Sequence, residues 1–373
     1  MSNKTKAALS IIFIAATFGL FGFMIWYTAF RLSAHFGAIS FLTFLIITAI
    51  AAIGSVVISF STGKFLNLFV SILHITNGYI FLFFVYSFLS FAAAHIVQLI
   101  WNPPLVWSGF AALTISFAAA FTGAIFGASF SVKKTDIKIK NMKSEITVLL
   151  FSDIHLGHQR GKAYLQKIVD KANALNPDLV FIAGDLVDTE PAFKPGVLDV
   201  LSGLKAPIYF TEGNHDEYLG SERLQKLLKQ YGVHILRNEV VQTHGVQLIG
   251  LNYMNADENA FDMHPSDDQD TVKSVLAKMP LESDIPSILL QHSPVGVQYA
   301  EAAGIDLMLA GHTHGGQIFP FTLIARLSFS LSGGLYRHGK TQTLVSKGAG
   351  TFMMRARLGT FNEINLLRLI PEN

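Results

Sequence analysis

The chain has 373 residues, of which 51% are hydrophobic and 14% are charged, and it contains no Cys. Up to Phe130 the only Lys or Arg residues are Lys4, Lys6, Arg31 and Lys64, and this part of the chain has no Asp or Glu. The first third is therefore neither an ordinary soluble domain nor a disordered segment. The lack of Cys excludes a disulfide framework, a thiolate zinc site and a Cys nucleophile.

Four apolar stretches in the first third are long enough to cross a bilayer, which requires about 20 helical residues. We predict a transmembrane region over residues 1–130, with helices at 10–30, 39–60, 72–94 and 106–130. The third apolar stretch, 65–100, is too long for one crossing but too short for two crossings and a turn, so one span is predicted there. Its connection to the fourth span is expected at Asn102-Pro103-Pro104.

The positions of the basic residues predict how these spans are oriented. Four spans return the chain to the side on which it began, and Lys and Arg accumulate on the cytoplasmic side. With the N-terminus inside, the inner flanks hold Lys4, Lys6, Lys64 and a basic linker over residues 131–144, against Arg31 outside. We therefore expect a multi-pass protein of the inner (cytoplasmic) membrane whose soluble domain faces the cytoplasm.

Residues 145–373 have the pattern of an α/β domain, because short β-branched runs alternate with amphipathic stretches. Helices are predicted at 162–175 and 221–231, where Leu, Ile and Val recur with helical spacing. Strands are predicted at 146–151, 178–183, 207–211, 246–251, 288–290, 305–310 and 341–345.

Small groups of metal-ligand residue types follow most of these predicted strands. Loops of an α/β sheet converge at the carboxyl ends of its strands, and glycines there allow close backbone approach. Each group taken singly is common in turns, but their repetition predicts one shared site. A ligand set of two carboxylates, one amide and four imidazoles drawn from these groups would suit Mn, Fe, Zn or Co better than Ca or Mg alone. The groups are Asp153-Ile-His155, Gly184-Asp185-Leu-Val-Asp188, Gly213-Asn214-His215-Asp216, Gln291-His292 and Gly311-His312-Thr-His314.

The segment 148–369 resembles the calcineurin-like metallophosphoesterases, whose motif blocks read Asp-x-His, Gly-Asp-x-x-Asp, Gly-Asn-His-Asp/Glu, His and Gly-His-x-His. All five blocks are intact. The strings Gly311-His-Thr-His-Gly-Gly-Gln317, Gly334-Leu-Tyr and Ser346-Lys-Gly-Ala-Gly-Thr351 are similar to the membrane-associated bacterial branch, some members of which are UDP-2,3-diacylglucosamine pyrophosphatases. The resemblance covers about 60% of the chain and implies an α/β/β/α sandwich after the four-helix transmembrane region.

This resemblance implies two divalent metal ions, with Mn favoured, that share Asp185. Two ions about 3.5–4 Å apart need a shared anionic ligand to offset their repulsion. The resemblance also implies that His215 assists the leaving oxygen while Asp216 orients the His215 ring. Asp188 is expected to contact the ligand residues and not a metal ion. His158 and Arg337 are candidate substrate-binding residues. One metal would be held by Asp153, His155, Asp185 and His314, and the other by Asp185, Asn214, His292 and His312.

The expected function is that of a membrane-bound phosphoesterase that hydrolyses a phosphodiester or pyrophosphate bond by metal-activated hydroxide. A lipid-linked substrate is favoured, because one span would suffice as an anchor and because residues 318–329 are unusually apolar. The alternatives are an anchored phosphoesterase for soluble nucleotides or phosphoproteins, and an inactive membrane sensor or scaffold. Nucleic acid is not expected as a partner, since 24 basic residues beyond Phe130 are balanced by 26 acidic ones. The oligomeric state is left open.

Overall fold

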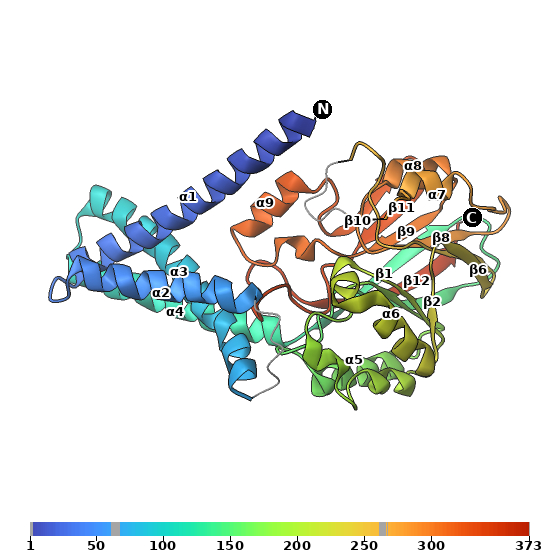
Figure 1. Cartoon of the computed structure of the whole chain (residues 1–373), viewed down its shortest axis with the longest axis horizontal. Helices are drawn as coiled ribbons and strands as arrows, with labels where there is room; N and C mark the ends of the chain where they lie inside the picture. The colour runs from blue at the N-terminus through green and yellow to red at the C-terminus, as the bar shows by residue number, and fades with distance from the viewer. Residues whose placement is uncertain (1–2, 61–67, 261–265, 267, 373) are drawn as a thin grey trace. The chain divides into compact units, whose positions relative to one another are not determined.

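The structure is a computed structural model that describes residues 3–60, 68–260, 266 and 268–372. The chain divides into two compact units. The first consists mainly of four helices (Figure 1): α1 (Asn3–His35), α2 (Phe41–Phe60), α3 (Leu68–Trp101) and α4 (Leu105–Ala128). Each contains a segment long and apolar enough to cross a membrane, so the structure has four candidate spans where four were predicted. The ambiguous third stretch is one helix of 34 residues, longer than the predicted 72–94, and residues 102–104 connect it to α4.

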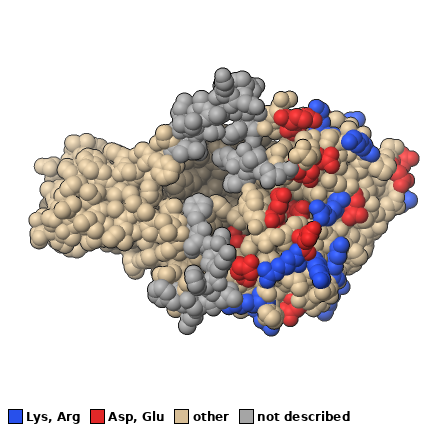
Figure 2. All heavy atoms as spheres, viewed as in Figure 1, with Lys and Arg blue, Asp and Glu red and all other residues tan. Residues whose placement is uncertain are grey.

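The helical unit is covered by apolar side chains, and some of its buried polar groups form hydrogen bonds between helices. Phe18 on α1, Ile50 on α2 and Leu99 on α3 are among its many exposed large hydrophobic residues, as expected for surfaces that face lipid. Buried Asn77 of α3 donates a hydrogen bond to the backbone oxygen of Ser55 on α2 at 3.0 Å, a contact typical of membrane helix pairs. Figure 2 shows Lys, Arg, Asp and Glu gathered on the other unit.

The second unit contains two six-stranded sheets, in the orders β1-β12-β2-β3-β4-β5 and β10-β11-β9-β8-β7-β6. In the first sheet β2, β3, β4 and β5 run parallel, and in the second β7, β8, β9 and β11 do. The strands are β1 (Ser131–Ile139), β2 (Ile146–Phe151), β3 (Leu179–Ala183), β4 (Ile208–Thr211), β5 (Val233–Ile235), β6 (Glu239–Thr243), β7 (Val246–Gly250), β8 (Ser287–Leu290), β9 (Leu307–Ala310), β10 (Gly334–His338), β11 (Thr341–Val345) and β12 (Glu363–Pro371).

The sheets pack face to face, and helices cover their outer faces, which is the predicted α/β/β/α sandwich (Figure 1). One apolar cluster joins side chains of β2, β3 and β12 to those of β7, β8 and β9, so it lies between the sheets. A second cluster packs α5 (Lys162–Leu175), α6 (Asn214–Gln230) and η2 (Leu198–Gly203) on the first sheet. A third packs α7 (Val272–Leu276) and α8 (Val297–Ala302) on the second.

The predicted basic linker at 131–144 is not a linker, because its first nine residues form β1. This strand pairs in parallel with β12, with Ser131 opposite Glu363 and Ile139 opposite Pro371. Ile137 and Ile139 are buried, whereas Lys133 and Lys134 are exposed. The lysines suggested a solvated connection, but at the edge of a sheet one face of a strand can remain in water.

The backbone that enters this unit is held by Asn362, whose side chain is buried. Its Nδ2 donates to the oxygens of Gly127 at 3.1 Å and Ser129 at 2.7 Å, just where α4 ends. Its Oδ1 accepts a hydrogen bond from Nε of buried Arg357 at 2.5 Å. One amide therefore satisfies backbone acceptors on one side and a guanidinium on the other.

We expect Asn362→Ala to destabilise this unit by about 2 kcal/mol or more, because it leaves buried polar groups without partners. That loss corresponds to a fall of about 4–8 °C in the thermal unfolding midpoint of the purified protein. Asn173→Ala is the matched control, because the Asn173 amide also bonds backbone, at Gly203 and Lys205, but its side chain is only half-buried. Equal midpoints for the two variants would contradict the structural role of Asn362.

Candidate metal centre

The predicted ligand side chains converge because each follows a strand whose carboxyl end lies at the same side of the sandwich. Asp153 and His155 follow β2, Asp185 follows β3, and Asn214 begins α6 after β4. On the second sheet His292 follows β8, while His312 and His314 follow β9. Three groups of side chains could each hold a metal ion, and one of them includes His215, which was not a predicted ligand. The groups are Asp153, His155 and His314; His155, Asp185 and His215; and Asp185, His292 and His312.

The first group lies around Asp153, which is fully buried. Nε2 of His314 is 3.4 Å from Oδ1 of Asp153 and 3.1 Å from Nε2 of His155. The backbone amide of His312 donates to the Asp153 carboxylate at 3.0 Å. Two imidazole nitrogens and a carboxylate oxygen thus face one another, which is the donor set of a mixed nitrogen and oxygen metal site.

The other two groups lie around Asp185, which contacts side chains from both sheets. Oδ2 of Asp185 is 3.2 Å from Nε2 of His292 and 3.7 Å from Nε2 of His155. Nδ1 of His312 is 3.1 Å from Nε2 of His292. Asp185 is thus in contact with a histidine of each predicted ligand set.

Five of the predicted ligands have left-handed backbone conformations, which are costly for residues other than glycine. Their φ angles are 53° at Asp153, 52° at His155, 51° at Asp185, 74° at His312 and 49° at His314. Such strain costs on the order of 1–3 kcal/mol per residue and clusters at functional sites. The turns after β2, β3 and β9 therefore store strain in order to direct these side chains to one point.

Two glycines of the motifs are required by how closely the loops approach each other. A Cβ at Gly213 would collide with Oδ1 of Asp185, and a Cβ at Gly311 would collide with Oδ2 of Asp153. The side chains that these glycines accommodate are the two carboxylates of the site. The pairing of glycine and ligand within the motifs is thus a steric requirement.

The electrostatic environment keeps Asp185 ionised. Burial opposes its charged form, but His292 and His215 hold the pKa of Asp185 well below its ordinary value. Burial likewise opposes the charged form of His292, yet Asp185 raises the pKa of this histidine to about 10. The buried carboxylate therefore attracts positive charge, as expected of a residue that would contact a cation.

His215 is oriented by Asp188, and the predicted role of Asp216 is wrong. Nδ1 of His215 is 2.7 Å from Oδ1 of Asp188. The Asp216 carboxylate instead accepts hydrogen bonds from the backbone amides of Val187 at 3.0 Å and Gly213 at 2.9 Å. Asp216 caps the first turn of α6, so its side chain is directed at backbone. Burial and neighbouring Asp185 raise the pKa of Asp216 to about 7.

Arg357 supports His314 and was not among the predicted site residues. This fully buried guanidinium donates to the oxygens of His314 at 3.0 Å and Gly350 at 2.9 Å. One of its nitrogens is also 3.1 Å from Nδ1 of His314. A single Arg outside the five motif blocks carries no sequence signal for this role. Phe352, whose ring centroid is 5.4 Å from that of His215, was missed for the same reason.

The two candidate substrate-binding residues differ in their placement. His158 is buried, and its backbone amide donates to Thr189 at 3.0 Å. Arg337 is exposed on β10 and pairs with Gln342 near the start of β11. Since β11 runs parallel to β9, the start of β11 lies at the opposite end of the sheet from the carboxyl end of β9, which His312 and His314 follow. Arg337 therefore lies at the end of the sheet away from the metal ligands. The prediction that it binds substrate at this site is not supported.

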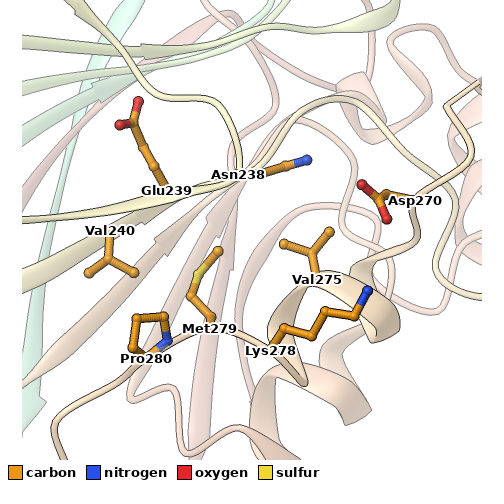
Figure 3. A pocket seen from close by; sticks show the side chains of 8 residues that line it. All are labelled: Asn238, Glu239, Val240, Asp270, Val275, Lys278, Met279 and Pro280. Atoms are coloured by element: carbon orange, nitrogen blue, oxygen red, sulfur yellow. The ribbon is translucent and has the colours of Figure 1, made fainter.

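A pocket of about 430 Å³ lies apart from the metal ligands, beside β6 and α7 (Figure 3). Val240, Val275 and Met279 provide its apolar lining, and Glu239 and Lys278 add opposite charges. None of the predicted ligands lines it. The candidate site is thus the histidine and aspartate cluster.

The donor chemistry of the cluster fits a metal ion. Oδ1 of Asn214 is buried and has no hydrogen-bond partner among the described residues. Burying an amide oxygen without a hydrogen bond costs about 1–3 kcal/mol of folding free energy, and a bound cation would offset this cost. Together with the facing imidazole nitrogens, this orphaned oxygen indicates that the side chains are arranged around a metal position.

The part of the chain that carries these residues is similar to known metallophosphoesterases. Residues 146–316 match the model of the calcineurin-like phosphoesterase family. An uncharacterized metallophosphoesterase of Helicobacter pylori is 36% identical over 246 residues, which cover 65% of this chain and 64% of that protein. A transmembrane protein with metallophosphoesterase domain from Danio rerio is 31% identical over 271 residues, which cover 68% of this chain and 60% of that protein. The matches thus span less than two thirds of these relatives.

A solved archaeal phosphodiesterase shares 15% identity and a TM-score of 0.32, over 55% of this chain and 85% of its own. This likeness is too distant to inform the reaction. The family match, the five intact motif blocks and the two-sheet sandwich agree: residues 146–316 are similar to the calcineurin-like phosphoesterases. The protein thus joins four candidate membrane helices to a two-sheet domain that matches this family.

We expect Asp185→Asn to abolish metal retention, because Asn keeps the size of the side chain but removes the negative charge that the two predicted ligand sets share. Metal content after reconstitution with Mn(II) and gel filtration measures this loss. Asp170→Asn on the exposed face of α5 is the matched control and should retain the wild-type content. Full metal occupancy in Asp185→Asn would refute the shared-ligand role.

Proposed function

We propose that the protein is a membrane-bound phosphoesterase with two divalent metal ions, which hydrolyses a phosphodiester or pyrophosphate bond. The observation that carries the proposal is the contact of Asp185 with histidines of both ligand sets. Asp153, His155, Asp185 and His314 would hold one ion, and Asp185, Asn214, His292 and His312 the other. When bound, such ions supply a nucleophile at neutral pH and stabilise charge on the phosphoryl oxygens.

His215 is the proposed general acid for the leaving oxygen. Asp188 contacts Nδ1 of its ring, so a proton remains at that nitrogen and Nε2 is the atom directed to substrate. The backbone amide of His215 donates to Oδ1 of Asp185 at 2.9 Å, which places the ring beside the shared ligand. A proton held at Nε2 would then be given to the oxygen that departs from phosphorus.

The substrate is proposed to be lipid-linked, and the catalytic domain to face the cytoplasm. Four candidate spans exceed what an anchor requires, which supports a substrate drawn from the membrane. The lysines of β1 follow α4 and favour the cytoplasmic side. Lys64, which the prediction also placed inside, lies outside the described residues. Anchored hydrolysis of soluble nucleotides or phosphoproteins is the second candidate, and an inactive sensor is the third.

A panel of substrates tests the activity and the role of His215 together. The full chain, purified in detergent with Mn(II), should hydrolyse bis(p-nitrophenyl) phosphate and a lipid pyrophosphate. We expect His215→Ala to keep its metal content but to lose about 10²–10⁴-fold in rate on the lipid pyrophosphate. The loss should be smaller on bis(p-nitrophenyl) phosphate, because its leaving group, p-nitrophenolate, needs little protonation.

Asp188→Asn is the companion variant, with an expected loss of about 10–100-fold, because it weakens the partner that orients His215. No hydrolysis by the wild-type protein on any substrate would favour the sensor alternative. Loss of metal in His215→Ala would instead make this histidine a ligand.

Single-cysteine labelling tests the orientation, since the chain has no native Cys. Asn102→Cys lies in the exposed connection between α3 and α4, and Lys167→Cys lies on the exposed face of α5. In intact cells a membrane-impermeant maleimide should label Asn102→Cys, whereas Lys167→Cys should react only after permeabilisation. Labelling of Lys167→Cys in intact cells would contradict the cytoplasmic assignment.

A further inference from the structure

Exposed apolar side chains in the phosphoesterase unit are concentrated in one short segment. Of the eight large hydrophobic residues that are exposed in the described part of this unit, five lie between residues 319 and 327. Leu327 is 88% exposed, and Leu323 and Ile324 are about half exposed. These three residues lie on α9 (Phe321–Ser328). Leaving so much apolar surface in water would cost free energy. We call Phe319, Leu323, Ile324 and Leu327 the apolar patch.

The opposite face of α9 packs on the loop that carries the metal ligands. Thr322 and Ala325 are the buried residues of this helix. A Cβ added at Gly316 would lie 2.6 Å from Cα of Thr322 and 2.8 Å from Cβ of Ala325. Gly316 ends the turn η3 (His314–Gly316), which begins at a predicted ligand. The surface of α9 is therefore rigidly connected to the candidate site.

The start of the α9 segment is also connected to the end of α4. The backbone amide of Phe319 donates to the oxygen of Leu358 at 2.6 Å. Three residues further on, Phe361 is exposed, and its ring centroid is 4.7 Å from that of Phe126 in the last turn of α4. Asn362 then binds the carbonyls of Gly127 and Ser129. Since α4 is a candidate span, the apolar patch begins on the side of this unit where the chain leaves the membrane.

The composition of the segment fits a lipid surface. Arg326 lies among the exposed residues of α9, and an Arg in this position can keep its charge at the headgroups while apolar neighbours enter the acyl region. Only residues 129 and 130 separate α4 from β1, so the chain can carry β1 no more than about 10 Å from the end of the span. A bilayer is thus always within reach of this unit.

We propose that the apolar patch is a membrane-contact surface, which inserts into the leaflet where α4 ends and keeps the candidate metal centre at the lipid headgroups. The contact depends on the membrane anchor and not on the proposed hydrolysis. It would favour substrates whose phosphate lies at the headgroup level, because the loop that carries His314 would be fixed at that depth.

Site-directed spin labelling of the full chain in nanodiscs of phosphatidylcholine and phosphatidylglycerol tests the proposal. Leu327→Cys and Ile324→Cys report the patch, and Lys167→Cys on α5 is the control. We expect labels on the patch to be relaxed more by oxygen, which partitions into lipid, than by a water-soluble nickel chelate. The control should show the reverse order.

Either of two other results would overturn the proposal. Relaxation by the nickel chelate at residues 324 and 327 would place the patch in water. Protection from both reagents would mean that protein covers the patch, either the helical unit or a second copy of the chain. Both patch positions are exposed, so the substitutions should leave the unfolding midpoint unchanged. Hydrolysis of bis(p-nitrophenyl) phosphate by the same samples reports the proposed activity separately.

Discussion

The burial of two carboxylates at the junction of two sheets is the constraint on which the rest of the domain depends. Asp153 and Asp185 are almost completely removed from water, and an uncompensated ion in such a place costs several kcal/mol. Histidines from both sheets surround them, yet five ligand residues must adopt strained backbone to do so. The apolar core between the sheets supplies the rigidity that keeps these turns in place.

The sequence predicted the strands whose residues are apolar throughout, such as β2 and β3, because strands covered on both faces require continuous apolar runs. The four edge strands β1, β5, β6 and β10 were missed, and so was β12 beside β1. β1 has exposed lysines, β5 has three residues and β6 is only partly buried, so none shows a continuous apolar run. The helix at 162–175 was predicted with its observed bounds because its apolar face is regular.

For the site, the identity of the candidate ligands could be predicted but the direction of each side chain could not. Asp188 and Asp216 are both acidic residues of the motif blocks, and only the fold decides which of them reaches His215. That choice depends on the start of α6, where a carboxylate at Asp216 satisfies free backbone amides. Arg357 could not be predicted, because its contacts come from segments that meet only in the folded domain.

The pairing of β1 with β12 has a consequence for biosynthesis. The first strand to leave the membrane is completed by the last strand of the domain, more than 220 residues later. During translation β1 must therefore wait, with its hydrogen-bonding groups unpaired, until the C-terminal segment has left the ribosome. Its lysines discourage pairing with other chains in that interval, so the same charges that favour one membrane orientation would also guard a nascent edge against aggregation.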